Sequence, residues 1–278
     1  MTLTHLLKAL IIAAILSPLP SFADQDENEW INTLKNQYFS GKTIDESNNI
    51  IELDAPVRAE DPALVPLKIS SKINQTSDSY IKKIVVLVDK NPFPFVGEFE
   101  FSPLSGKADL AMRIRVNTYS YIRAIAETND GKLYMSKKYV KVSGGCSAPV
   151  GADLDAAMQR LGKMKFRLDD GIKNKEPTLV QLLISHPNLS GMQMDQVTRF
   201  VRKSHFVKEM KVSFNDQPIL TAKTDIAISS DPNFRFYFVP ETAGTLKAEF
   251  TDTSCDSPTS RAVCTAGKTY SESYNVSP

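Results

Sequence analysis

The chain has few of the residues that most often carry chemistry. It contains three histidines and three cysteines in 278 residues. It has no glycine-rich phosphate loop, no Gly-x-Ser-x-Gly motif and no His-Glu-x-x-His motif. Neither sign of charge dominates, since 33 Lys and Arg stand against 32 Asp and Glu. This balance gives no reason to expect a nucleic acid or an anionic membrane as a partner. The pattern predicts no cofactor, no metal site and no catalytic residue.

Long apolar runs are also missing, apart from a short one near the N-terminus. Residues 1–23 contain Lys8, an apolar run over 9–16 and the ending Ser21-Phe22-Ala23. This is the layout of a secretory signal peptide. The run is far shorter than the roughly 20 apolar residues of a membrane-spanning helix. We therefore expect an exported protein in an oxidising compartment, with no membrane attachment after cleavage.

Two of the three cysteines lie close together near the C-terminus. Cys255 and Cys264 flank Pro258 and several small polar residues. A disulfide there closes a loop of about 10 residues and stabilises the fold by roughly 2.5–3 kcal/mol. A zinc site is the alternative, but it needs about four ligands, and only His186 and His205 are available to join the pair. The spacing favours the disulfide.

An odd cysteine count leaves Cys146 over. It follows Gly144 and Gly145, and glycine is costly to order inside a strand or helix. We therefore expect a flexible arm that presents an exposed Cys146, and a functional thiol is favoured over an incidental loop cysteine. A Cys–His pair with His186 or His205 is a minor alternative, because nothing nearby in the sequence orients it. Ordinary structural roles are favoured for both histidines.

The apolar pattern is mostly that of β-strands. Residues 29–40 have helical spacing and predict a short N-terminal helix. After them come a first set of strand-like segments, closed by a hairpin with an Asn129-Asp130-Gly131 turn, and a second set beyond residue 163. The first set comprises 50–53, 64–70, 80–89, 110–116, 121–128 and 133–142, and the second 164–168, 178–185, 205–214, 224–228, 234–238 and 246–250.

These segments predict an all-β protein of two antiparallel β-sandwiches joined by a linker. We assign 1–23 to the signal peptide, 24–142 to the first sandwich with its helix, 143–163 to the linker and 164–278 to the second sandwich. The linker holds the Cys146 arm and a short helix after Asp153. Arg113 and Arg115 are two residues apart on one predicted strand, so their side chains share a face. An anion site is possible there, but a solvated sheet face is favoured.

Several segments resemble the two subunits of the bacterial sulfur-oxidation (Sox) carrier. The Y-like segments are 55–66, 91–95 and Val140-Lys-Val-Ser-Gly-Gly-Cys146, and the Z-like segments are 183–191, 207–217, 226–232 and 243–246. Their order along one chain resembles the fused SoxYZ-like carriers associated with quinoprotein dehydrogenases. The resemblance implies two immunoglobulin-like sandwiches that pair within the chain. It also implies a periplasmic carrier, not an enzyme, that holds sulfur covalently on Cys146 and presents it to sulfur-oxidation enzymes.

Two departures from the family pattern bear on this interpretation. The separate Y subunit ends in Gly-Gly-Cys-Gly, whereas 132 residues follow Cys146 here. The Z-subunit sequence His-Pro-Met-Glu-Thr-Gly reads His186-Pro-Asn-Leu-Ser-Gly191. The alternative function is an accessory or docking module of a periplasmic quinoprotein (PQQ) alcohol dehydrogenase system without sulfur transfer. The Cys146→Ser variant separates the two, because only the carrier needs the thiol.

Overall fold

The computed structural model describes residues 27–149, 154–168, 170–254 and 265–277. The signal peptide and the Cys255–Cys264 disulfide, both predicted from sequence, lie outside these ranges. The chain divides into two compact units, residues up to Ser40 and residues from Gly41 onward. Among the described residues, no helix is both long and apolar enough to cross a membrane.

The first unit contains the predicted N-terminal helix. It consists of a π-helical turn η2 (Trp30–Leu34) followed directly by α3 (Lys35–Phe39). The Trp30 and Phe39 rings lie 6.3 Å apart between centroids. An aromatic contact therefore joins the first turn of the helix to its last residue.

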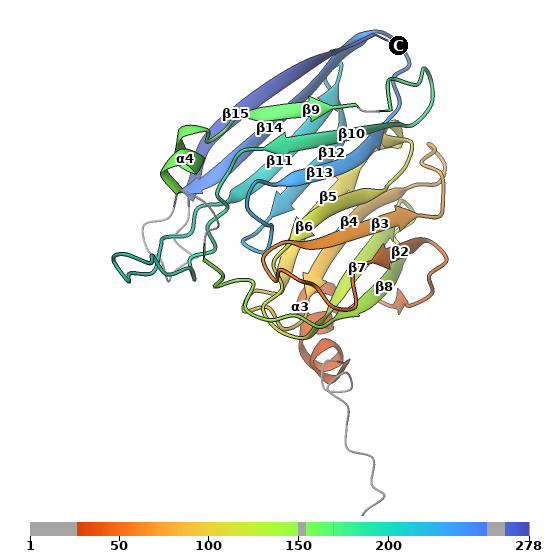
Figure 1. Cartoon of the computed structure of the whole chain (residues 1–278). Coiled ribbons are helices and arrows are strands. Elements are labelled where there is room, and N and C mark those ends of the chain that lie inside the picture. The colour runs from red at the N-terminus through yellow and green to blue at the C-terminus, as the bar shows by residue number, and fades with distance from the viewer. Residues whose placement is uncertain (1–26, 150–153, 169, 255–264, 278) are drawn as a thin grey trace, which may run out of the picture. The chain divides into compact units, whose positions relative to one another are not determined.

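The second unit is built from two β-sheets that lie face to face (Figure 1). The larger has nine described strands, in the order β1 (Ile44–Asp45), β8 (Leu133–Val140), β7 (Ser120–Thr128), β4 (Ile81–Val88), β5 (Phe95–Phe101), β12 (Gln217–Thr224), β11 (Val207–Phe214), β14 (Gly244–Ser254) and β15 (Thr265–Val276). The smaller has six, in the order β2 (Ile51–Asp54), β3 (Val65–Ser71), β6 (Leu110–Ile114), β13 (Asn233–Phe238), β10 (Thr178–Ile184) and β9 (Met164–Arg167). Two short helices complete the fold, η3 (Pro103–Ser105) and α4 (Leu154–Gln159).

The predicted all-β class and the two-sandwich organisation are confirmed. Strands β1–β8 form one sandwich and β9–β15 the other, and described neighbours pair antiparallel except β1 with β8. The sequence did not reveal that both sheets continue from one half of the chain into the other. β5 pairs with β12 in the larger sheet, and β6 pairs with β13 in the smaller. The two halves therefore pair within the chain.

The alternating patterns of the sequence place their apolar residues between the sheets. Leu110, Met112 and Ile114 are buried on β6, while Ala111 and Arg113 face outward at intermediate exposure. One apolar cluster runs through both halves of the unit. The rings of Phe99 and Phe234 meet across it at 6.2 Å. This shared core ties together strands that are far apart in sequence.

Turn residues in the sequence predicted some strand boundaries correctly, whereas one strand was missed because of its polar composition. The predicted hairpin is β7–β8, closed at Gly131, which has φ +82°. Asn215 and Asp216, at φ +48° and +64°, form the tight turn between β11 and β12. The strand predicted over 224–228 is wrong, because β12 ends at Thr224. β15 was missed because its side chains are mostly exposed and polar.

Candidate functional site at the junction of the two halves

Cys146 lies just beyond β8, and it is buried. Only 1% of the surface of Cys146 is exposed to solvent. The Ser190 hydroxyl, from the second half of the chain, donates a hydrogen bond of 2.5 Å to the Cys146 carbonyl oxygen. The expectation of an exposed thiol is therefore wrong in this conformation. A contact from a segment 44 residues away closes over the cysteine.

The two glycines before Cys146 are held by backbone hydrogen bonds. The Gly144 N–H donates to the Asn117 carbonyl at 2.7 Å, and the Gly145 N–H donates to Val116 at 3.0 Å. A Cβ on Gly145 would collide with the carbonyl oxygens of Pro62 and Val116. Gly144 has φ +92°, a conformation that favours glycine. The glycines thus permit a close backbone approach, and their interpretation as a flexible arm is wrong for this conformation.

Arg115 is the charged side chain at this site. It is 2% exposed, and its Nη1 and Nη2 donate to the carbonyls of Gly145 at 3.3 Å and Asn188 at 3.4 Å. Burial lowers the pKa of Arg115, and the negative charges of Cys146 and Asp61 oppose that shift. The guanidinium binds the carbonyl of Gly145, so it lies next to the segment that carries Cys146.

The predicted solvated face holds for Arg113 but is wrong for Arg115. β6 ends at Ile114, and the Arg115 N–H then donates to the Ala227 carbonyl at 2.6 Å. The alternation that would keep both arginines on one face stops there. Arg113 stays half-buried and donates to the Asp231 carbonyl at 3.2 Å.

The segments that resemble the Sox subunits converge around Cys146. From the first half, the Asn91 side chain donates to the Arg115 carbonyl at 2.9 Å and accepts from the Asn117 N–H at 2.8 Å. From the second half, the Ser229 hydroxyl donates to the Ala63 carbonyl at 2.6 Å. The motifs that seemed scattered along the sequence therefore build one junction.

In the second half of the chain, Asn188 links several segments at this junction. Its φ is +46°, a left-handed conformation that asparagine tolerates better than most residues. Its side chain donates to the Ile228 carbonyl and accepts from the Val207 N–H, each at 3.0 Å. Its backbone carbonyl faces Arg115, as described above. One weak signal for this role was present in the sequence, the departure at Asn188 from the family pattern within His186–Gly191.

His186, His205 and Asp252 form a cluster that sequence reasoning missed. Their potential ligand atoms all lie within 4.8 Å of one another. His205 Nε2 is 2.9 Å from Asp252 Oδ2, and His186 Nε2 is 3.6 Å from the same oxygen. The two imidazole rings meet edge to face at 4.6 Å. Asp252 lies beyond every motif that drew attention, so no spacing in the sequence connects it with the histidines.

The protonation of His186 argues against a metal at this cluster. Its Nδ1 accepts the Asn188 N–H at 3.0 Å, so in the neutral ring the proton sits on Nε2. An Nε2 that carries a proton has no lone pair for a cation. Burial lowers the pKa of His186, and the Asp252 carboxylate, 3.6 Å from its Nε2, opposes that shift. Burial raises the pKa of Asp252, but the contact with His186 and the hydrogen bonds from His205 and the Lys268 N–H hold it well below its usual range.

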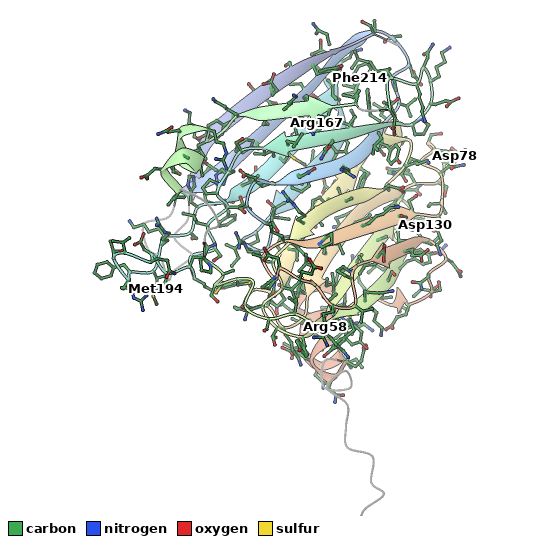
Figure 2. All side chains as sticks on the ribbon, in the orientation of Figure 1. Arg58, Asp78, Asp130, Arg167, Met194 and Phe214 are labelled. Carbon is green, nitrogen blue, oxygen red and sulfur yellow. The ribbon has the colours of Figure 1, made fainter. Side chains whose placement is uncertain are left out.

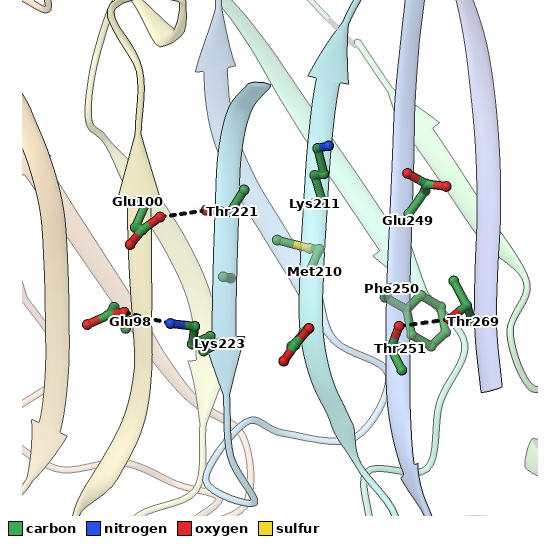
Figure 3. Close-up of a pocket in the computed structure, with 12 residues that line it drawn as sticks. Glu98, Glu100, Met210, Lys211, Thr221, Lys223, Glu249, Phe250, Thr251 and Thr269 are labelled. Carbon is green, nitrogen blue, oxygen red and sulfur yellow. Dashed lines mark hydrogen bonds and ion pairs between the residues drawn. The ribbon is translucent and has the colours of Figure 1, made fainter. Parts of the chain in front are cut away.

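Beyond this junction, a surface groove lies on the outer face of the larger sheet (Figure 3). Its charged and polar groups largely satisfy one another. Lys223 Nζ pairs with Glu98 at 3.5 Å, and the Thr221 hydroxyl donates to Glu100 at 3.2 Å. No residue that contacts the Cys146 segment lines this groove. It has the properties of a solvated sheet face.

The loop that follows Ser190 carries exposed apolar side chains. Met194, labelled in Figure 2, is 44% exposed, and Phe200 is 77% exposed. An isolated bridge joins Met194 to Val201. Asp195 pairs with Arg202 at the base of the loop. The segment that holds Cys146 at one end therefore offers an apolar surface at the other.

Comparison with known families assigns both halves of the chain. Residues 35–146 match the family of sulfur oxidation protein SoxY, and residues 166–263 match that of sulphur oxidation protein SoxZ. The chain is a fused SoxYZ-like protein, with a SoxY domain followed by a SoxZ domain. The SoxY match ends at Cys146 itself, and the SoxZ match contains His186, Asn188, Ser190 and Asp252. The junction described above is thus the SoxY–SoxZ interface within one chain.

Solved structures give two further similarities. The chain is similar to the sulfur carrier protein SoxY from Chlorobium limicola f thiosulfatophilum, at 24% identity and a TM-score of 0.36, over 44% of this chain and 100% of that one. It is also similar to a superoxide reductase (neelaredoxin) from Ignicoccus hospitalis, at 18% identity and a TM-score of 0.31, over 34% of this chain and 80% of that one. No curated protein matches the chain.

Proposed function

We propose that this protein is a periplasmic sulfur carrier that holds a sulfur intermediate covalently on Cys146. The observation that supports this most directly is the position of Cys146. It is the last residue of the SoxY match, and it lies where that domain meets the SoxZ domain. The protein is a carrier and not an enzyme, so its partners perform the chemistry on the bound sulfur. The signal-like residues 1–23 support export to the periplasm.

The covalent step is a thiol exchange. The Cys146 thiolate attacks a sulfur atom of a donor that contains a sulfur–sulfur bond, and a new bond forms to Cys146 Sγ. The old sulfur–sulfur bond breaks, and its electron pair leaves with the donor as a thiolate or thiosulfate anion. No net oxidation occurs, so no external oxidant is needed. The product on Cys146 is a persulfide or a thiosulfonate, depending on the donor.

Transfer requires Cys146 to leave its buried position. Opening breaks the hydrogen bonds from Ser190 to Cys146, from Gly144 to Asn117 and from Gly145 to Val116. Each of the three joins residues 144–146 to a residue that lies outside the strands, so the segment can open without unpairing either sheet. The closed position then shields the attached sulfur between partner enzymes, and the open position presents it.

Mass spectrometry of the protein isolated without reductant tests this function. The peptide that contains Cys146 is expected to carry one or more added sulfur atoms, which reductant removes. The matched control is Cys146→Ser, which should carry nothing and should abolish sulfur transfer. A Cys146→Ser variant with full function would contradict the carrier role. It would favour instead a docking module for a quinoprotein alcohol dehydrogenase system.

A further inference from the structure

Arg115 carries a buried positive charge that the fold does not balance. Among the described ranges, no carboxylate forms an ion pair with it. Its two hydrogen bonds go to carbonyl oxygens at 3.3 and 3.4 Å, beyond the roughly 2.7–3.2 Å of ordinary N–H···O bonds. Its Nε is buried and has no hydrogen-bond partner. A guanidinium cannot lose its charge at any ordinary pH, so burial without an anion is costly.

A second donor near Cys146 is also unmatched. Gln193 is fully buried, and its Oε1 accepts the N–H of Ser190, the residue whose hydroxyl holds the Cys146 carbonyl. The Nε2 of Gln193 has no partner. Unmatched buried donors are rare in folded proteins. Two of them among the residues around one cysteine indicate a site for a hydrogen-bond acceptor, and the positive charge of Arg115 favours an acceptor that is an anion.

The anion that fits is the sulfur of Cys146. Two groups near Arg115 can carry a negative charge, the Cys146 thiolate and the Asp61 carboxylate. Asp61 is exposed, and its Oδ1 already accepts the Ala63 N–H at 2.7 Å. Cys146 is buried beside the guanidinium, since Gly145, the residue before it, accepts from Arg115 Nη1. The low-dielectric surroundings strengthen any charge interaction between the two side chains.

We propose that Arg115 forms an anion subsite for Cys146, which stabilises the thiolate and then holds the negatively charged end of the attached sulfur group. The second half of this statement rests on the proposed carrier function. The planar N–H groups of a guanidinium match the oxygens of a sulfonate, as they match those of carboxylate and phosphate. Arg115 is a binding residue in this role. It reaches both the arm at Gly145 and the SoxZ domain at Asn188.

The test is the ultraviolet absorbance of the Cys146 thiolate as a function of pH. Each trace is corrected with the same protein carrying Cys146→Ser. Replacing Arg115 with Met should raise the midpoint of the titration by about 1–3 pH units, because a neighbouring opposite charge is lost. Arg115→Gln, which keeps polar contacts with the carbonyls, should give the same shift if the Met variant fails to fold. Arg113→Met, two residues earlier on β6, is the control and should give none.

A reaction with tetrathionate provides an independent readout. The thiolate displaces thiosulfate, and an S₂O₃ group becomes attached to Cys146 through a new sulfur–sulfur bond. At neutral pH the rate should fall about tenfold or more in Arg115→Met, in step with the lost thiolate. An unchanged titration midpoint and an unchanged rate would overturn the subsite. Absence of sulfur on Cys146 in isolated wild-type protein would instead overturn the carrier function and leave the titration result standing.

Discussion

The SoxY domain buries two arginines, and the fold treats their charges differently. Arg123, within the larger sheet, is fully buried against Asp89, with bonds of 2.9 Å from Nε and 2.7 Å from Nη2. Arg115, at the SoxY–SoxZ junction, has carbonyl contacts and an unmatched Nε. The first charge is neutralised by the chain itself, as a structural charge must be. The second is left available beside a cysteine, as a binding charge must be.

The largest effect is expected at the structural pair. Arg123→Met leaves Asp89 buried without its partner, which should cost about 3–5 kcal/mol of the free energy of unfolding. Arg115→Met removes a poorly matched cation and should change stability by no more than about 1 kcal/mol. Urea unfolding of both variants measures the difference. Equal losses in the free energy of unfolding would mean that Arg115 stabilises the fold as much as Arg123 does.

The next effect concerns the glycines of the arm. Gly145→Ala should cost about 3 kcal/mol, because its Cβ meets backbone oxygens that cannot move aside. Gly144→Ala meets nothing within 4 Å and should cost about 1 kcal/mol through its φ alone. Thermal unfolding of each single variant tests the order. If both are neutral, the closed conformation is not the main one in solution, and the sequence-based expectation of a mobile arm returns.

Acid should weaken the junction through His186. Because burial lowers the pKa of His186 in the folded protein, the unfolded chain binds a proton first, near pH 6.5. Stability should therefore fall as pH drops below about 6.5 and level off once the folded protein is also protonated. Asp252, whose pKa is depressed, should add a further loss below about pH 3.9. Urea unfolding at several pH values measures both. His186→Gln should remove the first loss and reduce the second, because His186 contributes to the depressed pKa of Asp252.

The smallest effect is expected on the outer face of the larger sheet. Lys223 is 68% exposed where it pairs with Glu98. Lys223→Ala should change the free energy of unfolding by less than about 1 kcal/mol, because water screens exposed pairs. Unfolding in low and in high salt provides the measurement. A larger loss that salt does not reduce would give this groove more than a surface role.

The sequence predicted the parts of this protein whose signals are local. The β7–β8 hairpin follows from Asp130-Gly131 and the flanking apolar runs, and the inward face of β6 follows from alternation. The burial of Cys146 does not follow in this way. Gly144 and Gly145 allow either freedom or close approach, and the choice depends on the Pro62 carbonyl, more than 80 residues earlier in the chain.

Arg115 and the histidine cluster were hidden for the same physical reason. Arg115 turns inward because the Ala227 carbonyl captures its N–H after β6 ends. His186, just beyond β10, meets Asp252 on β14 only because both belong to one folded SoxZ domain. Such contacts between distant segments leave no periodicity or spacing in a single sequence. The family resemblance supplied the segments, and the fold shows what they build together.

The pairing of β5 with β12 and of β6 with β13 has a consequence for concentration. In two separate subunits, a junction of this kind assembles by a bimolecular reaction, so it is lost when the subunits become dilute. Within one chain the partners meet at a fixed effective concentration, of millimolar order for short linkers, whatever the amount of protein present. The junction around Cys146 therefore forms within each folded molecule, and it persists however dilute the protein becomes.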